Sequence, residues 1–133
     1  MMRIYFAASI SGGRQKVDDY EKIINFLDRY GVVLTKHVGD KNLTIRGESI
    51  NSEEIYNRDI EMLNECDLLI AEVTTPSLGV GYEIAYAEKL NKRIICVYED
   101  GINLSSMIQG NRKLTFISYK SMDELASKLQ ILI

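Results

Sequence analysis

The sequence has little of several residue types, and each shortage argues against a class of protein. Its 133 residues include one proline, one histidine, two cysteines and no tryptophan. A Pro-rich interaction module would need more proline, and one histidine with two separated cysteines does not easily build a zinc site. Sixteen Lys and Arg face 19 Asp and Glu, a net charge of −3. There is therefore no basic excess for binding a nucleic-acid backbone, and we expect no nucleic-acid partner.

Long apolar runs are also missing. No stretch approaches the ~20 apolar residues that span a bilayer, and the first ten residues lack the apolar core and cleavage site of a secretory signal. Cys66 and Cys96 stand among apolar neighbours, which predicts two buried thiols rather than a disulfide. We therefore expect a cytoplasmic protein with no membrane partner. Its composition is that of a globular chain, and its length predicts one domain over residues 1–133.

Strand patterns alternate with helix patterns along the chain. The predicted strands cover residues 3–8, 32–35, 67–73, 93–98 and 114–118, with helices between them and after the last. Strands that are apolar throughout are typical of a parallel sheet covered on both faces. This predicts a three-layer α/β fold, a flavodoxin-like or Rossmann-like doubly wound sheet of five parallel strands in the order 2-1-3-4-5. Ligands of such sheets bind beyond the carboxyl ends of the strands.

The loop after the first strand, SISGGR at residues 9–14, is a candidate anion site. Its two glycines let the backbone approach an anion near the start of the following helix, and Arg14 could add a fork of donors. The alternative is a tight turn with a surface arginine. The loop is not a Walker P-loop, because no Gly-Lys-Ser/Thr follows.

The loop after the third strand, EVTTPSLGVGYE at residues 72–83, is more unusual. Ser77 follows a proline and is a plausible helix N-cap. Gly79 and Gly81 then fall in the first turn, where glycine disfavours a helix; close approach of the backbone to a ligand is one reason for them. Glu83 lies just beyond, either as a functional carboxyl or as an acid placed favourably near a helix N-terminus.

Asp59 shares one stripe of the second helix with Ile55, Met62 and Leu63. An acid facing inward is costly unless it has a partner, so Asp59 is either solvated at the edge of the stripe or aimed into the site. Two carboxyls from different elements near an anion-binding loop suggest glycosidic-bond chemistry.

Two further side chains on the predicted strands are candidates. His37 ends the predicted second strand, where it is either structural or a ligand contact. Tyr5 lies in the first strand, and its hydroxyl needs a partner if it is buried. A nearby carboxylate would serve as that partner.

Together these positions resemble the 2′-deoxynucleoside 5′-phosphate N-hydrolases, within the wider nucleoside 2-deoxyribosyltransferase superfamily. The matching blocks are IYF at 4–6, SISGGR at 9–14, RYG at 29–31, VLT at 33–35, HV at 37–38, Asp59, AEVTTPSLGVGYE at 71–83, LS at 104–105 and MI at 107–108. The sequence departs from the family at Ala7-Ala8, where Cys-Gly is usual, and through residues 39–50. These departures bear on the shape of the turn and on base preference.

The resemblance implies hydrolysis of deoxynucleoside 5′-monophosphates with retention, without a metal or cofactor. Glu83 aligns with the nucleophile that attacks C1′, Asp59 with the acid that assists departure of the base and then activates water, and Tyr5 with the hydroxyl that positions the nucleophile. The implied substrate and phosphate contacts are Ser9, Ile10, Ser11, Gly12, Gly13, Arg14, Tyr20, His37, Ser77, Gly79 and Ser105. The family also implies a homodimer in which Ser105 completes the neighbouring site.

Two alternatives to hydrolysis stay open. A deoxyribosyltransferase shares the covalent intermediate but passes the sugar to another base. A nucleotide-binding module without turnover is the second, because doubly wound domains often bind ligands without turning them over.

Overall fold

The computed structural model describes residues 1–10, 16–40 and 50–133. The strands are β1 (Met2–Ala7), β2 (Gly31–Val33), β3 (Leu68–Glu72), β4 (Arg93–Glu99) and β5 (Thr115–Tyr119). The α-helices are α1 (Val17–Leu27), α2 (Ser52–Glu65), α3 (Leu78–Lys89), α4 (Ser106–Gln109) and α5 (Met122–Leu132), and a 3₁₀ turn, η1 (Lys36–Gly39), follows β2. None of the helices in these ranges is long and apolar enough to cross a membrane.

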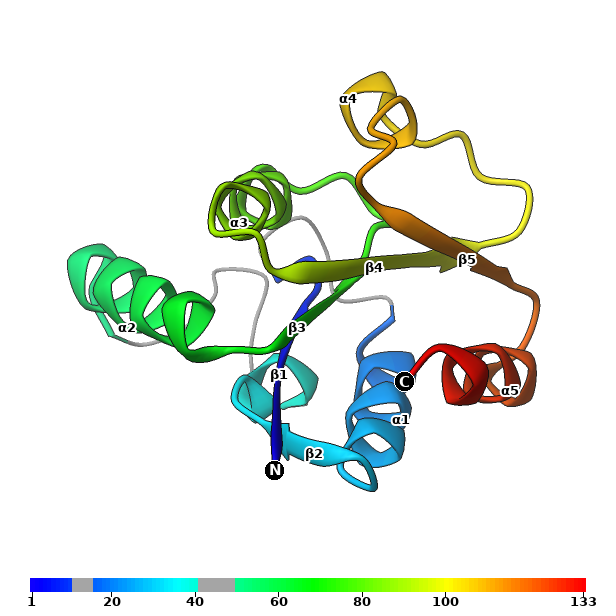
Figure 1. Ribbon diagram of the computed structural model, residues 1–133, viewed down its shortest axis with the longest axis horizontal. Helices are drawn as coiled ribbons and strands as arrows, with labels where there is room; N and C mark the ends of the chain where they lie inside the picture. Colours follow the sequence, from blue (N-terminus) through cyan, green and yellow to red (C-terminus); the bar gives the residue numbers. More distant parts are fainter. Residues whose placement is uncertain (11–15, 41–49) are drawn as a thin grey trace.

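The five strands form one parallel sheet in the order β2-β1-β3-β4-β5, which confirms the predicted topology. Figure 1 shows α1 and α5 on one face of this sheet and α2 and α3 on the other. The chain therefore has the three predicted layers, and the order of the strands changes direction between β1 and β3. This switch point lies where a doubly wound sheet binds its ligand.

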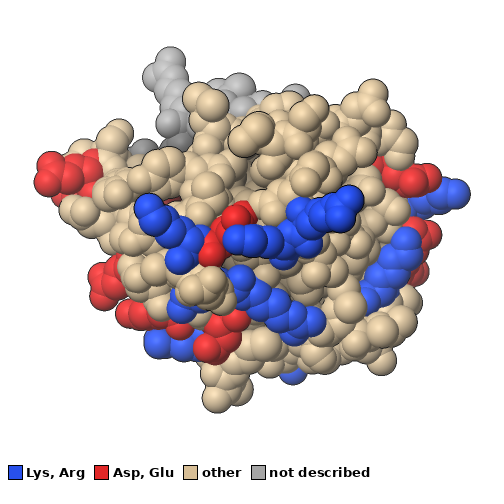
Figure 2. All heavy atoms as spheres, turned by 45° about the horizontal axis from the view of Figure 1, so that its top comes forward, with Lys and Arg blue, Asp and Glu red and all other residues tan. Residues whose placement is uncertain are grey.

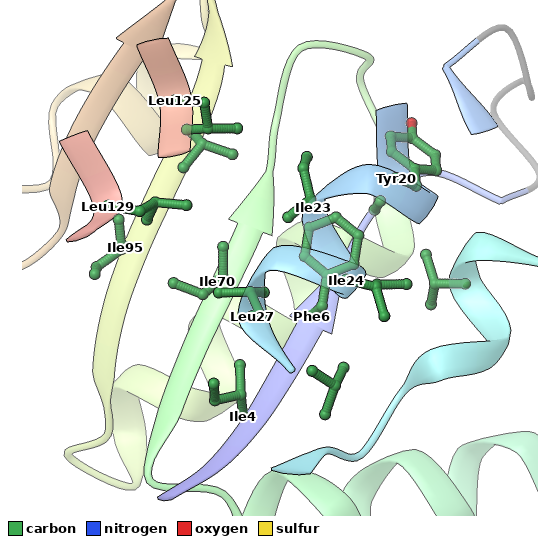
Figure 3. Packing of buried hydrophobic residues seen from close by; sticks show 14 of the residues in the cluster. Ile4, Phe6, Tyr20, Ile23, Ile24, Leu27, Ile70, Ile95, Leu125 and Leu129 are labelled. Carbon is green, nitrogen blue, oxygen red and sulfur yellow. The ribbon is translucent and has the colours of Figure 1, made fainter. Parts of the chain in front are cut away.

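Alternation along the strands assigns each side chain to one of the two faces. Ile4 and Phe6 of β1 pack with α1 and α5 (Figure 3), whereas Tyr5 belongs to the opposite cluster with α2 and α3. Because β1 is paired with β3 in register, Leu69 and Ala71 lie on the same side as Tyr5. The tyrosine is thereby directed toward α3. Cys66 and Cys96 are buried free thiols in this second cluster, as predicted.

The predicted second strand is too long. β2 ends at Val33, because the chain turns where the buried Thr35 reaches back to β1. Its hydroxyl donates to the Phe6 carbonyl at 2.6 Å and accepts from the Phe6 amide at 2.8 Å. His37 consequently lies in η1 rather than at the end of a strand, although still at the carboxyl edge of the sheet.

The surface carries charges of both signs. On the face shown in Figure 2, Lys and Arg side chains are interspersed with Asp and Glu, and an uncharged region lies above them. That face offers no continuous basic stripe of the kind that follows a nucleic-acid backbone.

Candidate active site

A cavity of about 550 Å³ opens at the carboxyl edge of the sheet, at the switch point between β1 and β3. It is lined by the end of β1, by η1, by the start of α2 and by the loop that leads from β3 into α3. Seven of the predicted site residues line it: Tyr5, Ile10, His37, Asp59, Ser77, Gly79 and Glu83. Residues up to 78 positions apart in the sequence therefore meet at one site.

Glu83 lies at the centre of the site's electrostatics. Its carboxylate accepts a hydrogen bond from the Tyr5 hydroxyl. The pKa of this carboxyl is raised from 4.5 to about 7. Burial is the largest cause and the negative charge of Asp59 adds to it, while the Tyr5 hydrogen bond and the Arg58 charge act in the opposite direction. Burial and the two carboxyls also raise the pKa of Tyr5. Tyr5 therefore stays a neutral donor, and Glu83 can change its protonation state near neutral pH.

Asp59 reaches the cavity from α2 and is held by the residue before it. Arg58 donates to its Oδ1 from Nε at 3.0 Å and from Nη2 at 2.9 Å. The same Nη2 lies 3.2 Å from Nε2 of His37. About a quarter of the Asp59 side chain is exposed. The prediction of an acid aimed into the site fits this placement, whereas a freely solvated acid at the edge of the stripe does not.

Arg58 is the site residue that the sequence did not suggest. It brings a positive charge to two carboxyls and links Asp59 on α2 to His37 on η1. The stripe of apolar residues on α2 pointed to Asp59 but passed over its neighbour. The link between Asp59 and His37 becomes visible only in the folded chain, where the long Arg58 side chain reaches η1. Its position directly before an inward acid was the one available signal.

Ser77 and Gly79 shape the wall that leads to Glu83. Ser77 is the N-cap of α3, and its hydroxyl accepts from the Val80 amide at 3.2 Å. Among the residues that the structure describes, a Cβ placed at Gly79 would meet only the Ser77 hydroxyl, at 3.8 Å, so this part of the chain leaves room for a larger residue there. The glycine is then better explained by what approaches from the cavity than by packing within the chain.

Other predicted contacts are placed differently. Ser9 is 1% exposed, and within the described ranges its hydroxyl has no hydrogen-bond partner. Tyr20 does not line the cavity: its ring packs edge-on against Phe6, 6.0 Å between centroids, and its hydroxyl points toward the carboxyl edge (Figure 3). Ser11, Gly12, Gly13 and Arg14 lie outside the described residues.

Ser105 lies apart from this cavity. It lines a neighbouring hollow of about 770 Å³ between α3 and α4, together with the exposed side chains of Leu78 and Met107. The two hollows share the wall formed by residues 76–78 and Val80. Ser105 is therefore beside the site but does not enter it within one chain.

The donor set gives no sign of a metal centre. Across residues 1–10, 16–40 and 50–133, no three His, Cys, Asp or Glu side chains are grouped so that they could hold an ion. The cavity brings together two carboxyls and a phenol, and the Arg58 guanidinium binds one of the carboxyls.

Comparison with known proteins assigns the chain to a family. A model of the nucleoside 2-deoxyribosyltransferase family matches residues 4–121. The chain is 47% identical over 112 residues to the 5-hydroxymethyl-dUMP N-hydrolase of Danio rerio, covering 82% of this chain and 78% of that protein. It is 46% identical over 111 residues to the human 5-hydroxymethyl-dUMP N-hydrolase, covering 80% and 64%.

A solved structure gives the same fold. The Clostridium botulinum CMP N-glycosidase superposes with a TM-score of 0.72 over 98% of this chain and 99% of that one, at 24% identity. At that identity the likeness speaks for the three-layer architecture alone. The family match over most of the sequence and the close relatives carry the assignment: this chain belongs to the nucleoside 2-deoxyribosyltransferase family.

Proposed function

We propose that this protein hydrolyses the N-glycosidic bond of 2′-deoxynucleoside 5′-monophosphates, releasing a free base and 2-deoxyribose 5-phosphate. One observation carries the proposal: a partly buried Glu83, held by Tyr5, shares its cavity with Asp59. The named activity of the relatives, hydrolysis of a deoxynucleotide, supports it. A protein that only binds nucleotides has no need of this set of groups.

The chemistry follows from the two carboxyls. The ionised Glu83 attacks C1′ as the bond from C1′ to the base nitrogen breaks, and it forms a glycosyl ester with the sugar. The two carboxyls share one proton, which Asp59 carries while Glu83 is ionised; Asp59 gives this proton to the departing base and then takes one from the water that attacks C1′. Cleavage of the ester returns Glu83 to its carboxylate. Two inversions at C1′ give net retention.

Tyr5 and Arg58 each hold one of the two carboxyls. The Tyr5 hydroxyl fixes one Glu83 oxygen and stabilises its charge. Arg58 fixes an oxygen of Asp59 at 2.9 Å and so sets where the proton donor lies. Both effects are positioning and electrostatics prepared before the substrate arrives.

The substrate contacts form the second part of the proposal. Ser77, Gly79 and the loop at residues 9–14 would hold the 5′-phosphate, with Arg14 as its charged partner. Ile10 and His37, which line the cavity, would contact the rest of the nucleotide. Binding of the remote phosphate would orient C1′ for attack by Glu83.

The test is a substrate screen with three arms. Purified protein is incubated with the common deoxynucleoside monophosphates and with 5-hydroxymethyl-dUMP, with the matching nucleosides, and with each nucleotide plus a second base. We expect release of base from a nucleotide, poor release from the nucleoside, and no gain from the added base. No release from any nucleotide by the wild type would refute hydrolysis.

Base exchange is the second candidate, because the family model takes its name from transferases. It would appear in the same screen as a new nucleotide formed faster than free sugar phosphate. Tight nucleotide binding by calorimetry without either product would instead indicate a module that only binds.

We also propose that the protein is a homodimer in which Ser105 contacts the phosphate bound by its partner. Leu78 is 97% exposed and Met107 84%, and both line the hollow beside the site. A two-fold contact there would cover them and bring each Ser105 to the edge of the other cavity. A single domain over residues 1–133 and a cytoplasmic location, suited to the free thiols, complete the proposal.

Mixing two inactive variants tests the shared site. Glu83→Ala lacks the nucleophile and Ser105→Ala lacks the donated hydroxyl. If Ser105 acts across the interface, a mixed dimer regains one intact site, or about a quarter of wild-type activity after random exchange. No recovery, or a monomer by light scattering, would refute the shared site.

A further inference from the structure

A second polar cluster lies on the opposite face of the sheet from Glu83. Its centre is Glu72, the last residue of β3, which is 1% exposed. Residues 68 and 70 of β3 face α1 and α5, so alternation directs Glu72 to that side as well. The proposed reaction gives this carboxyl no role. Burying it without partners would be costly.

Its two oxygens are occupied by donors from three segments. Oε1 accepts from the Thr74 amide at 2.7 Å, and Oε2 accepts from the Thr74 hydroxyl at 2.9 Å and from the Tyr119 hydroxyl of β5. The Lys16 ammonium, at the start of α1, lies 3.9 Å from Oε2. The same ammonium binds Glu99 at 2.6 Å.

Thr74 is the point where this cluster reaches the site. Its hydroxyl donates to Glu72 and also accepts from the Glu99 amide at 2.9 Å, which ties the loop to the end of β4. The preceding residue, Val73, donates its amide to Val97 of β4 at 2.9 Å. The loop therefore leaves the sheet with its first two residues fixed.

The fixed loop is short. Two residues separate Thr74 from Ser77, which caps α3 and lines the cavity, and Glu83 follows on the second turn of the same helix. Pro76 further restricts the backbone between them. A shift of Thr74 would therefore move Ser77 and the first turn of α3, and with them one wall of the cavity.

We propose that Glu72, Thr74 and Tyr119 are positioning residues that hold the wall from Thr74 to Gly79 in the geometry needed for the substrate. None of them lies among the residues that line the cavity on the Glu83 side. They act through Ser77 and the start of α3. The inference rests on the proposed function for its kinetic consequence, but its structural consequence is independent of it.

The central variant is Thr74→Val, which keeps the branched shape but removes both hydrogen bonds of the hydroxyl. Thr74→Ser keeps the hydroxyl and should restore them. Asp67→Ala is the matched control: Asp67 precedes the other end of β3 and accepts from the Arg3 amide at 2.8 Å, so its loss perturbs the same strand far from the cavity. Tyr119→Phe removes the third hydrogen bond to Glu72, and Glu72→Gln replaces one of the two accepting oxygens with a donor.

Hydrogen exchange gives the readout that does not depend on activity. We expect the Val80 and Gly81 amides, which bond to Ser77, to exchange about tenfold faster in Thr74→Val, as the loss of one to two hydrogen bonds would allow. Thr74→Ser and Asp67→Ala should leave these amides protected. Unchanged exchange in Thr74→Val, or equal loss of protection in Asp67→Ala, would overturn the proposal.

Kinetics gives the second readout. We expect Thr74→Val to raise the KM for a deoxynucleotide about fivefold or more with a smaller change in kcat, and Thr74→Ser to stay close to wild type. Wild-type kinetics in Thr74→Val would also overturn the positioning role. If the wild-type protein releases no base at all, the proposed function fails, and the exchange measurement still decides whether the cluster holds the wall.

Discussion

Removing the Tyr5 hydroxyl is the sharpest perturbation of the candidate nucleophile. Glu83 has a pKa of about 7 because burial raises it more than the Tyr5 hydrogen bond and the Arg58 charge lower it. A nucleophile must be ionised, so activity is expected to fall as the pH drops below about 7, approaching tenfold per unit. Tyr5→Phe leaves the burial unchanged and removes a donor that stabilises the carboxylate.

The size of the effect follows from that single bond. A hydrogen bond to a charged group contributes about 1.5–3 kcal/mol, and one pKa unit corresponds to about 1.4 kcal/mol. Tyr5→Phe should therefore raise the pKa of Glu83 by about one to two units. At pH 7 the ionised fraction would drop from about one half to between about 1 and 10 %, a loss of roughly five- to fiftyfold.

The assay is base release from a deoxynucleotide, measured as kcat/KM between about pH 5.5 and 9. In Tyr5→Phe the acid limb of the pH profile should move to higher pH, and much of the activity should return at high pH. Tyr86→Phe is the control, since its hydroxyl meets Asn64 on another side of α3, and its limb should stay in place. An unmoved limb in Tyr5→Phe, or a loss equal at every pH, would refute the reasoning.

Three further predictions concern stability. Because the folded state raises the Glu83 pKa from 4.5 to about 7, the free energy of unfolding of the wild type should fall as the pH rises from about 4.5 to about 7. Glu83→Gln should lack this fall and be up to about 3 kcal/mol more stable than the wild type at pH 8 by urea denaturation. Parallel curves of stability against pH for the two proteins would contradict this. Gly79→Ala and Gly81→Ala should each stabilise α3 by about 0.5–1 kcal/mol in thermal melts, because neither new methyl group meets a close neighbour among the described residues. Only Gly79→Ala should lower kcat/KM, and equal activity of the two variants would argue against close approach of the substrate to Gly79. Gly31→Ala should cost about 1–3 kcal/mol or more, since its Cβ would lie 2.2 Å from the Met2 carbonyl oxygen, and an unchanged melting temperature would contradict that packing.

The sequence predicted the fold because its signals were local. Continuous apolar runs such as residues 67–73 indicate buried strands, and the spacing of the apolar residues in α1 indicates a helix. A parallel sheet whose strands are joined by crossover connections then leaves few possible topologies. The length of β2 was missed because its end depends on Thr35 bonding to Phe6, 29 residues away. Contacts of that kind have no signature in a single sequence.

The residues of the candidate site likewise fall into those that the sequence could predict and those that it could not. Glu83 and Ser77 could be predicted from one continuous block of sequence, and Asp59 from its place on a helical stripe. Arg58 could not, because its role depends on the direction of a long side chain toward His37. The sequence predicts a strand that contains Glu72 but suggests no role for this residue, because only folding brings Tyr119 to it.

The central claim is that Glu83 becomes covalently joined to the sugar during the reaction. Wild-type protein mixed rapidly with a deoxynucleotide, quenched in acid and examined by intact-protein mass spectrometry tests this directly. We predict one added 2-deoxyribose 5-phosphate per chain, located on the peptide that contains Glu83, with free base released in equal amount; Glu83→Ala should show neither. Base release without any adduct on that peptide, or release that persists in Glu83→Ala, would contradict the account.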